Sequence, residues 1–334
     1  MAKCYICGSQ INSENESEEH ILPNCIGGRS KSKNLLCKSC NSDLGNSVDS
    51  YLCYALGSIA TRLDIKRESG KPHAFESIRA DTGEKVMVSR GGVPRWQGPL
   101  KVKRVGLDLR IEGPGDFRDK DRLIEAIRKK LERKNVDFDF DTYLQELEEA
   151  GIRERHLFEA LENVKMDETG GRPELMHSFE LGDKELRAIC KIAVSFYLYN
   201  KGNHKCVEHL AHYIKFGDST SNYVFLYYPE NEIVTDKNND EILHTIVLIG
   251  DVNERVLYSY IELFSTFKYI VLLDGAYTGA GLSKSYCFDV TQSQVVNKLV
   301  DLKISKNELL WNLKYYIYPF EQVQSHLEAL NTLM

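Results

Sequence analysis

The sequence lacks a long hydrophobic run, which excludes a helical membrane-spanning protein. A transmembrane helix needs about 18 or more consecutive apolar residues, and no stretch of the 334 residues approaches that length. The first residues, MAKCYICGSQ, also lack the basic and then apolar segments that are typical of a signal peptide. We therefore expect a cytoplasmic protein without membrane contact, in which cysteine thiols stay reduced.

The sequence also lacks an excess of positive charge and several well-known catalytic motifs. Its net charge of −6 argues against a protein that coats nucleic acid. Beyond residue 72 there is no phosphate-binding glycine loop, no nucleophile elbow and no second cluster of metal-ligating residues. A hydrophobic content of 42% is ordinary for a globular protein, and the length allows two domains or one large domain with a small appendage.

Four of the nine cysteines form two Cys-x-x-Cys pairs, Cys4 with Cys7 and Cys37 with Cys40. Two such pairs supply the four thiolates of a tetrahedral Zn²⁺ site. Residues 1–48 contain few large apolar side chains, so a metal would supply folding free energy that hydrophobic burial cannot. The sequence therefore predicts one structural zinc. We interpret the remaining five cysteines as small apolar core residues: Cys25, Cys53, Cys190, Cys206 and Cys287.

The segment between the two pairs is 29 residues long, more than the roughly 15 to 20 residues of a simple zinc ribbon, so we expect a functional insertion. It carries Glu19-His20-Ile21-Leu22-Pro23, then Gly27-Gly28, then Asn34-Leu35, and Asn41 follows the second pair. Hydrolysis of a phosphodiester needs a base, a cation and in-line positioning. Imidazole suits the base, and carboxylate or amide oxygens suit Mg²⁺ or Mn²⁺.

In this order, the motifs resemble the HNH endonucleases, whose ββα-metal motif runs acidic-His-x-x-Pro, glycine-rich loop, Asn-Leu, and Cys-x-x-Cys followed by Asn or His. The resemblance covers about residues 4–50. It implies that His20 is the general base, that Glu19 and Asn41 hold the catalytic metal, and that Asn34 braces the loop and orients the base. The Glu departs from the commoner Asp. The family's cleavage leaves a 3′-hydroxyl and a 5′-phosphate.

The residues themselves leave other interpretations open. His20 could be a core or zinc-adjacent histidine, Glu19 a solvated acid, Asn34 the cap of a turn, and Asn41 the cap of the helix after the second pair. Glu19 and His20 are neighbours and would point to opposite faces of a strand, so one must lie at a strand end or bulge to share a site. The rival function is a non-catalytic zinc ribbon that binds nucleic acid or a protein.

A local excess of positive charge follows the insertion. Between Arg29 and Lys71 there are eight Lys and Arg residues against four Asp and Glu residues. Such a stretch can contact a phosphate backbone, with an ordinary solvated face as the alternative. We predict contacts to DNA, with RNA as an alternative substrate, from Arg29, Lys31, Lys33, Arg62, Lys66 and Arg67.

The rest of the chain is predicted to contain both helices and strands. Apolar spacing predicts helices within 47–66, 119–134, 184–199, 205–215 and 306–314, two short helices within 141–164, and strands within 74–111 and near 223, 244, 268 and 286. The predicted fold class is α+β, with a zinc-bound ββα-metal module at 1–72 and a larger mixed α/β region at 73–334, which has a sub-boundary near 170.

These observations predict a metal-dependent endonuclease that hydrolyses DNA, with prokaryotic or phage restriction or defence as its biological role. Residues 73–334 would be a sensor or specificity region. A regulatory ligand or a protein partner for that region, and an oligomeric state, stay open. A third hypothesis is a nuclease that is activated when this region binds a small signalling molecule.

Overall fold

The computed structural model describes residues 2–70, 73–80, 83, 85–96, 101–105, 108–112, 120–133, 139–149, 175–176, 182–217, 222–315 and 318–333. The chain divides into two units, one made of Met1–His73, Arg90–Gly92 and Phe179–Met334, and the other of Ala74–Ser89 and Val93–Ser178. Helices and sheets occur in both units, so the predicted α+β class is confirmed. The boundary predicted at residue 72 stays a prediction, and the sub-boundary near 170 lies outside the described residues.

The N-terminal segment has the predicted order of two strands followed by a helix. Strands β1 (Glu19–His20) and β2 (Lys31–Ser32) pair antiparallel, with Glu19 opposite Ser32 and His20 opposite Lys31. The turn between them contains η1 (Asn24–Ile26). Gly28 is required there, because a Cβ atom would lie 1.8 Å from the Leu22 carbonyl oxygen. Helix α1 (Lys38–Leu44) then runs through the π-helical turn η2 (Gly45–Asp49) into α2 (Ser50–Arg62).

A six-stranded antiparallel sheet organises the rest of the first unit. Its strand order is β14-β13-β10-β11-β12-β9. The strands are β9 (Val224–Leu226), β10 (Leu243–Asp251), β11 (Val256–Leu263), β12 (Phe267–Asp274), β13 (Leu282–Asp289) and β14 (Gln294–Val296). The strands predicted near 223, 244, 268 and 286 are confirmed. The central strand β11 is buried along its whole length, because both faces of the sheet are covered.

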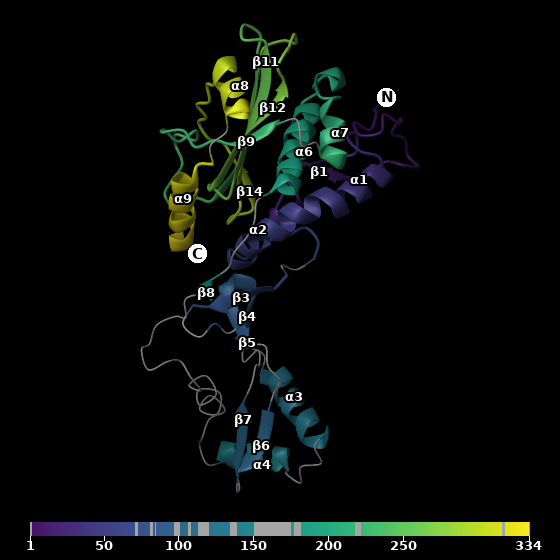
Figure 1. The fold of residues 1–334 in the computed structure, drawn as a ribbon. Helices are drawn as coiled ribbons and strands as arrows, with labels where there is room; N and C mark the ends of the chain where they lie inside the picture. The colour runs from purple at the N-terminus through teal and green to yellow at the C-terminus, as the bar shows by residue number, and fades with distance from the viewer. Residues whose placement is uncertain are drawn as a thin grey trace. The chain divides into compact units, whose positions relative to one another are not determined.

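Helices cover the two faces of this sheet. On one face, α6 (Asp183–Tyr199), η4 (His204–Cys206) and α7 (Leu210–Phe216) share one hydrophobic core with the N-terminal segment. On the other face, α8 (Lys306–Lys314) packs with residues of β9 and β11 (Figure 1). The helices predicted at 184–199 and 306–314 are confirmed, and the one predicted at 205–215 is split between η4 and α7. The terminal helix α9 (Phe320–Leu333) was not predicted.

Where the structure describes it, the second unit contains a sheet of order β5-β4-β3-β8, a hairpin and two helices. Its elements are β3 (Phe75–Arg79), β4 (Lys85–Ser89), β5 (Val93–Trp96), β6 (Lys101–Val105), β7 (Asp108–Glu112), α3 (Lys120–Arg133), α4 (Phe140–Glu149) and β8 (Leu175–Met176). The turn η3 (Arg90–Gly92) belongs to the first unit. Helix α3 confirms the prediction at 119–134. Of the two helices predicted within 141–164, α4 is the first, and the remainder lies outside the described residues.

A disulfide between Cys25 and Cys53 corrects one interpretation of the cysteines. It joins η1 to α2 with a Cα–Cα distance of 5.7 Å. The expectation that all five single cysteines are reduced apolar core residues is therefore wrong for this pair, whose separation of 28 residues hid it. Cys190 and Cys287 are buried free thiols. No helix among the described residues is long and apolar enough to cross a membrane.

Candidate functional site

The four paired cysteines come together as predicted. The Sγ atoms of Cys4, Cys7, Cys37 and Cys40 all lie within 4.8 Å of one another, and those of Cys7 and Cys37 are 3.8 Å apart. Thiolates bound at about 2.3 Å to a tetrahedral zinc are about 3.8 Å apart. The donor set therefore fits a single tetrahedral ion.

The environment of these thiols differs from one to the next. Burial opposes ionisation of Cys7, but hydrogen bonds with Ser9 outweigh it and lower the pKa of Cys7 to about 6. Burial raises the pKa of Cys4 and of Cys40. Because a metal binds the thiolate form, a bound ion would favour the deprotonated state of all four.

The first cysteine knuckle is anchored to helix α6. Tyr5, which lies between Cys4 and Cys7, is buried, and its hydroxyl oxygen is 3.2 Å from Ser195 Oγ. A buried hydroxyl needs such a partner to offset its loss of water. The knuckle is thus fixed to a helix that is 190 residues away in the sequence.

Glu19 is buried, with 2% of its surface exposed, so it is not a solvated acid. Its carboxylate accepts a hydrogen bond from Lys191 Nζ on α6. The same ammonium group donates to both carboxylate oxygens of Asp49, at 3.0 and 2.8 Å. Burial works to lower the pKa of Lys191, but the attraction of Asp49 and Glu19 outweighs it and raises that pKa. We therefore assign the charged form to Lys191.

His20 follows Glu19 in β1 and lies on the more exposed side. Its side chain is 26% exposed, which excludes a core histidine. His20 Nε2 is 3.2 Å from Glu68 Oε2, and Lys31 Nζ is 3.0 Å from the same oxygen. The backbone N–H of Glu68 donates to Asn24 Oδ1 at 2.9 Å, which holds this loop beside η1.

The two predicted asparagines have different surroundings. Asn41 lies inside α1, where its Nδ2 donates to Ser17 Oγ at 3.1 Å and to the Glu18 carbonyl at 3.2 Å. The alternative that Asn41 caps a helix is wrong, because α1 begins at Lys38 with Cys37 as its cap residue. Asn34 is exposed, and its backbone N–H donates to Ser32 Oγ at 3.1 Å.

The order of strands, knuckles and helix in this segment is the order that the resemblance implied. Residues 4–55 match the family model of the HNH endonucleases. This match confirms the resemblance, supports a nuclease-type function for residues 4–55, hereafter the HNH module, and covers the four cysteines, Glu19 and His20. Comparison of the chain with curated proteins and with solved structures gave no match.

HNH nucleases use a divalent metal, and both residues predicted to hold it, Glu19 and Asn41, make hydrogen bonds to other protein groups in this arrangement. The carboxylate of Glu19 is bound by Lys191, and the amide nitrogen of Asn41 is bound to Ser17 and Glu18. Within the described residues, the cysteine set is the one group of three or more His, Cys, Asp and Glu side chains that is placed to hold a metal ion. Glu19 and His20 also face different surroundings, as expected for neighbours in a strand.

Two residues of this site, Lys191 and Glu68, were not predicted from the sequence. Lys191 is 172 residues from Glu19, and Glu68 is 48 residues from His20, so no local spacing connects them. Lys191 did carry a signal, because it is the single charged residue in the apolar run AICKIAVSFYL. A lysine in such a run needs a buried partner. Glu68 had no comparable signal.

The cations predicted to contact DNA mostly have protein partners. Arg29 Nη2 donates to the Lys66 carbonyl at 2.8 Å and to Ser293 Oγ at 3.0 Å, and thus joins the HNH module to the sheet. Arg62 Nη1 donates to Asn331 Oδ1 at 3.0 Å, and burial lowers its pKa.

The lysines of this stretch are nearer the surface. Lys31 pairs with Glu18 and Glu68, and Lys33 pairs with Glu16, each at 3.0 Å. Lys66 is exposed and Arg67 is half-buried.

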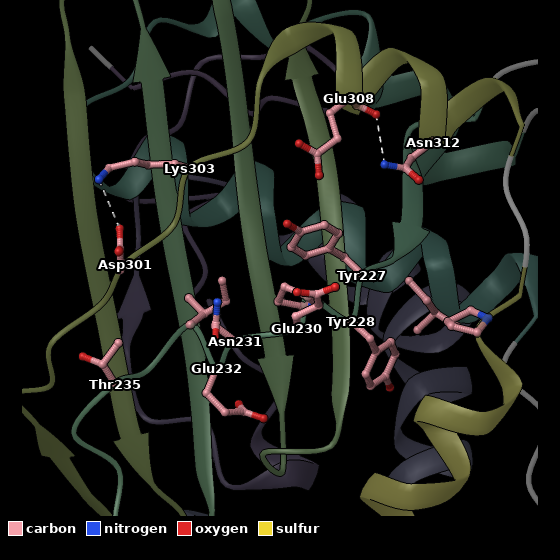
Figure 2. Close-up of a pocket in the computed structure, with 14 residues that line it drawn as sticks. Tyr227, Tyr228, Glu230, Asn231, Glu232, Thr235, Asp301, Lys303, Glu308 and Asn312 are labelled. Carbon is pink, nitrogen blue, oxygen red and sulfur yellow. Dashed lines mark hydrogen bonds and ion pairs between the residues drawn. The ribbon is translucent and has the colours of Figure 1, made fainter.

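An open cavity of about 870 Å³ lies over the other face of the main sheet, beside α8 (Figure 2). Its lining is rich in acids, among them Glu230, Glu232, Asp301 and Glu308. Asp301 pairs with Lys303 at 3.6 Å. Carboxylates repel phosphate, so the acids of this lining disfavour the binding of nucleic acid.

Proposed function

We propose that the chain is an endonuclease whose HNH module hydrolyses phosphodiester bonds in DNA, with His20 as the general base. The observation that supports this most is the setting of His20 within a matched HNH segment. The imidazole is partly exposed, and its Nε2 faces the Glu68 carboxylate at 3.2 Å. If Nε2 carries the proton and donates to Glu68, the lone pair of Nδ1 is available to accept a proton from water.

The chemistry assigned to these residues is simple. His20 takes a proton from water, the hydroxide attacks phosphorus, and the bond from phosphorus to the 3′ oxygen breaks in line with the attack. The 3′ oxygen takes up a proton from solvent and leaves as the 3′-hydroxyl. The family's cleavage implies a 5′-phosphate and a 3′-hydroxyl. Glu68 keeps the ring in one tautomer and orientation, as a carboxylate partner does for other catalytic histidines. Asn34 is proposed to brace the loop.

A divalent metal would stabilise the negative charge that develops on the phosphate. Mg²⁺ or Mn²⁺ as that ion, and Glu19 and Asn41 as its ligands, remain proposals. No step is built on them, because Glu19 is engaged by Lys191. If Glu19 and Asn41 do hold the metal, Glu19→Ala and Asn41→Ala should require more metal for cleavage, and excess metal should partly restore the rate.

Incubation of supercoiled plasmid with the full zinc-loaded chain and Mg²⁺ or Mn²⁺ tests the proposal. We expect nicked and linear products, with ends that ligate directly because they carry a 5′-phosphate and a 3′-hydroxyl. Parallel reactions with RNA test the alternative substrate. Binding without cleavage under every metal condition would favour the non-catalytic zinc-ribbon function.

A ligand-activated nuclease is the second candidate, and the cavity beside α8 favours it. Cleavage that appears only after a small ligand is added would support it. A role in prokaryotic or phage restriction or defence is part of the proposal and is motivated by the joining of an HNH module to a large region that the family match does not cover.

Lys31 and Lys33 of the HNH module should contribute DNA affinity. Lys31→Glu with Lys33→Glu should weaken binding to all DNA sequences and reduce the log-log salt slope by about two, since each lost phosphate contact removes about one unit. Arg29 is left unchanged, because its guanidinium joins the module to Ser293. Binding is measured by fluorescence anisotropy at several salt concentrations.

Lys303→Glu is the matched control for this pair. Lys303 is 89% exposed and paired with an acid, but it lines the acidic cavity beside α8. It should leave the slope unchanged. A slope that is also unchanged in the Lys31 and Lys33 variant would place the DNA on another surface.

A further inference from the structure

Helix α6 inserts one charged side chain into the HNH module. Residues Ala188–Leu198 of this helix are all buried, and Lys191 is the one charged residue among them. Its side chain is 3% exposed. Burying an ammonium group is unfavourable unless it is paired and hydrogen-bonded. Lys191 therefore requires buried partners of opposite charge.

The partners of Lys191 are two carboxylates from separate parts of the HNH module. Glu19 comes from β1, and Asp49 is the last residue of η2. Lys191 Nζ donates to one oxygen of Glu19 and to both oxygens of Asp49. An ammonium group has three N–H donors, so all of its hydrogen-bonding capacity is directed at these carboxylates.

We propose that Lys191 is an internal cation that keeps the Glu19–Asp49 carboxylate pair from binding a divalent metal, so that this pair is a latent metal site closed by α6. Hard divalent cations bind between carboxylate oxygens, which is the position that the ammonium group holds. This inference deepens the proposed function and rests on it only for the consequence for cleavage.

Charge and access support this assignment. Two carboxylates and one ammonium leave a net charge of −1, whereas a divalent ion in place of the ammonium would neutralise the pair. The ion and the ammonium repel each other at this range, so the metal must displace Lys191 from a buried ion pair. The Asp49 side chain is 19% exposed, against 3% for Glu19 and for Lys191, so the metal would approach from the side of Asp49.

The consequence is a direct connection between the sheet and the nuclease. Lys191 belongs to a helix that shares its core with β10, β11 and β12. Whether a metal reaches Glu19 thus depends on the position of α6, and the HNH module is held in a metal-poor state while the ion pair is intact.

The proposal is tested by titrating the full zinc-loaded chain with Mn²⁺ at pH 8 without DNA. Electron paramagnetic resonance measures the bound Mn²⁺. Lys191→Met replaces the ammonium group with an uncharged side chain of similar length. It should gain one Mn²⁺ site at least about 100-fold tighter than any in the wild type, because the competing buried ion pair is gone. Adding Glu19→Gln should remove that site.

Ser195→Ala is the control, because Ser195 contacts the HNH module from the same helix but carries no charge. It should bind Mn²⁺ like the wild type. A folded Lys191→Met protein that retains zinc and binds Mn²⁺ no tighter would overturn the proposal.

A second variant keeps the test decisive if Lys191→Met does not fold. With Lys191 present and DNA absent, Glu19→Gln should leave Mn²⁺ binding unchanged, because Lys191 already occupies the Glu19 carboxylate. A lower Mn²⁺ affinity in that variant would show that Glu19 binds metal beside Lys191, against the proposal. None of these readouts needs cleavage. A Lys191→Met chain that gains the Mn²⁺ site but does not cleave DNA would refute the proposed function and leave this inference standing.

Discussion

Replacing His20 with Ala should lower the rate of plasmid cleavage by about two to four orders of magnitude, the usual contribution of a general base. The fold should survive the change, because His20 is 26% exposed and belongs to neither the buried core nor the cysteine set. Zinc content and DNA binding should also stay close to those of the wild type. Single-turnover cleavage, zinc analysis and anisotropy measure the three properties separately.

His326→Ala is a closely matched control. The His326 side chain is also 26% exposed and also lies near a carboxylate, with its Nε2 3.4 Å from Glu232. It lies in α9, outside the HNH module, so its loss should not change the cleavage rate. A folded His20→Ala protein that cuts at the wild-type rate would end the proposed mechanism. Activity that falls only with the fraction of unfolded protein would make His20 a structural residue.

The local order of the HNH module could be predicted because its signals are short in range. Each Cys-x-x-Cys pair is a four-residue pattern, and the glycine pair that follows Pro23 marks a turn. Gly28 shows why that pattern is strict, since any side chain there would collide with the Leu22 backbone. Strands such as β10 and β12 were visible as short apolar runs.

The partners of the site could not be predicted, because they depend on tertiary packing. Glu19 precedes His20 in the sequence, but its burial is set by α6, and nothing near it in the chain indicates Lys191. The disulfide between Cys25 and Cys53 could not be predicted for the same reason, because it requires η1 to lie against α2. Strand β11 was missed because Ser259 and Glu262 interrupt its apolar run, although both are buried.

The stability of the N-terminal segment also depends on tertiary packing. Few large apolar side chains in residues 1–48 led to the expectation of a module held together by zinc. The structure places its apolar residues, including Leu36, Leu44 and Val48, in the same core as α6. Burial against α6 therefore stabilises the module in addition to the metal cross-link that the four thiols could form, and local sequence reveals only the cross-link.

Cys4→Ser or Cys37→Ser should unfold the N-terminal part of the HNH module instead of merely slowing cleavage. Structural zinc contributes about 10–16 kcal/mol of apparent binding free energy in zinc-finger peptides, which is as large as the whole stability of a typical domain. Each variant leaves three thiols for the ion, and Cys37 is also the residue that precedes α1. We expect about one zinc per wild-type chain by elemental analysis and much less in either variant.

Hydrogen exchange should locate the unfolding. The disulfide still joins η1 to α2, and β10 to β12 contribute none of the four cysteines. Protection should therefore be lost in residues 2–16 and 33–44 and kept in β10 to β12. Cys206→Ser is the control, because Cys206 is a partly exposed free thiol outside the set and should retain zinc and protection. Wild-type protein that holds no zinc when purified without chelator would contradict the zinc assignment. Cys4 and Cys37 variants that both remain folded and active would also contradict it. The buried contacts with α6 would then be enough to stabilise the module without the four thiols.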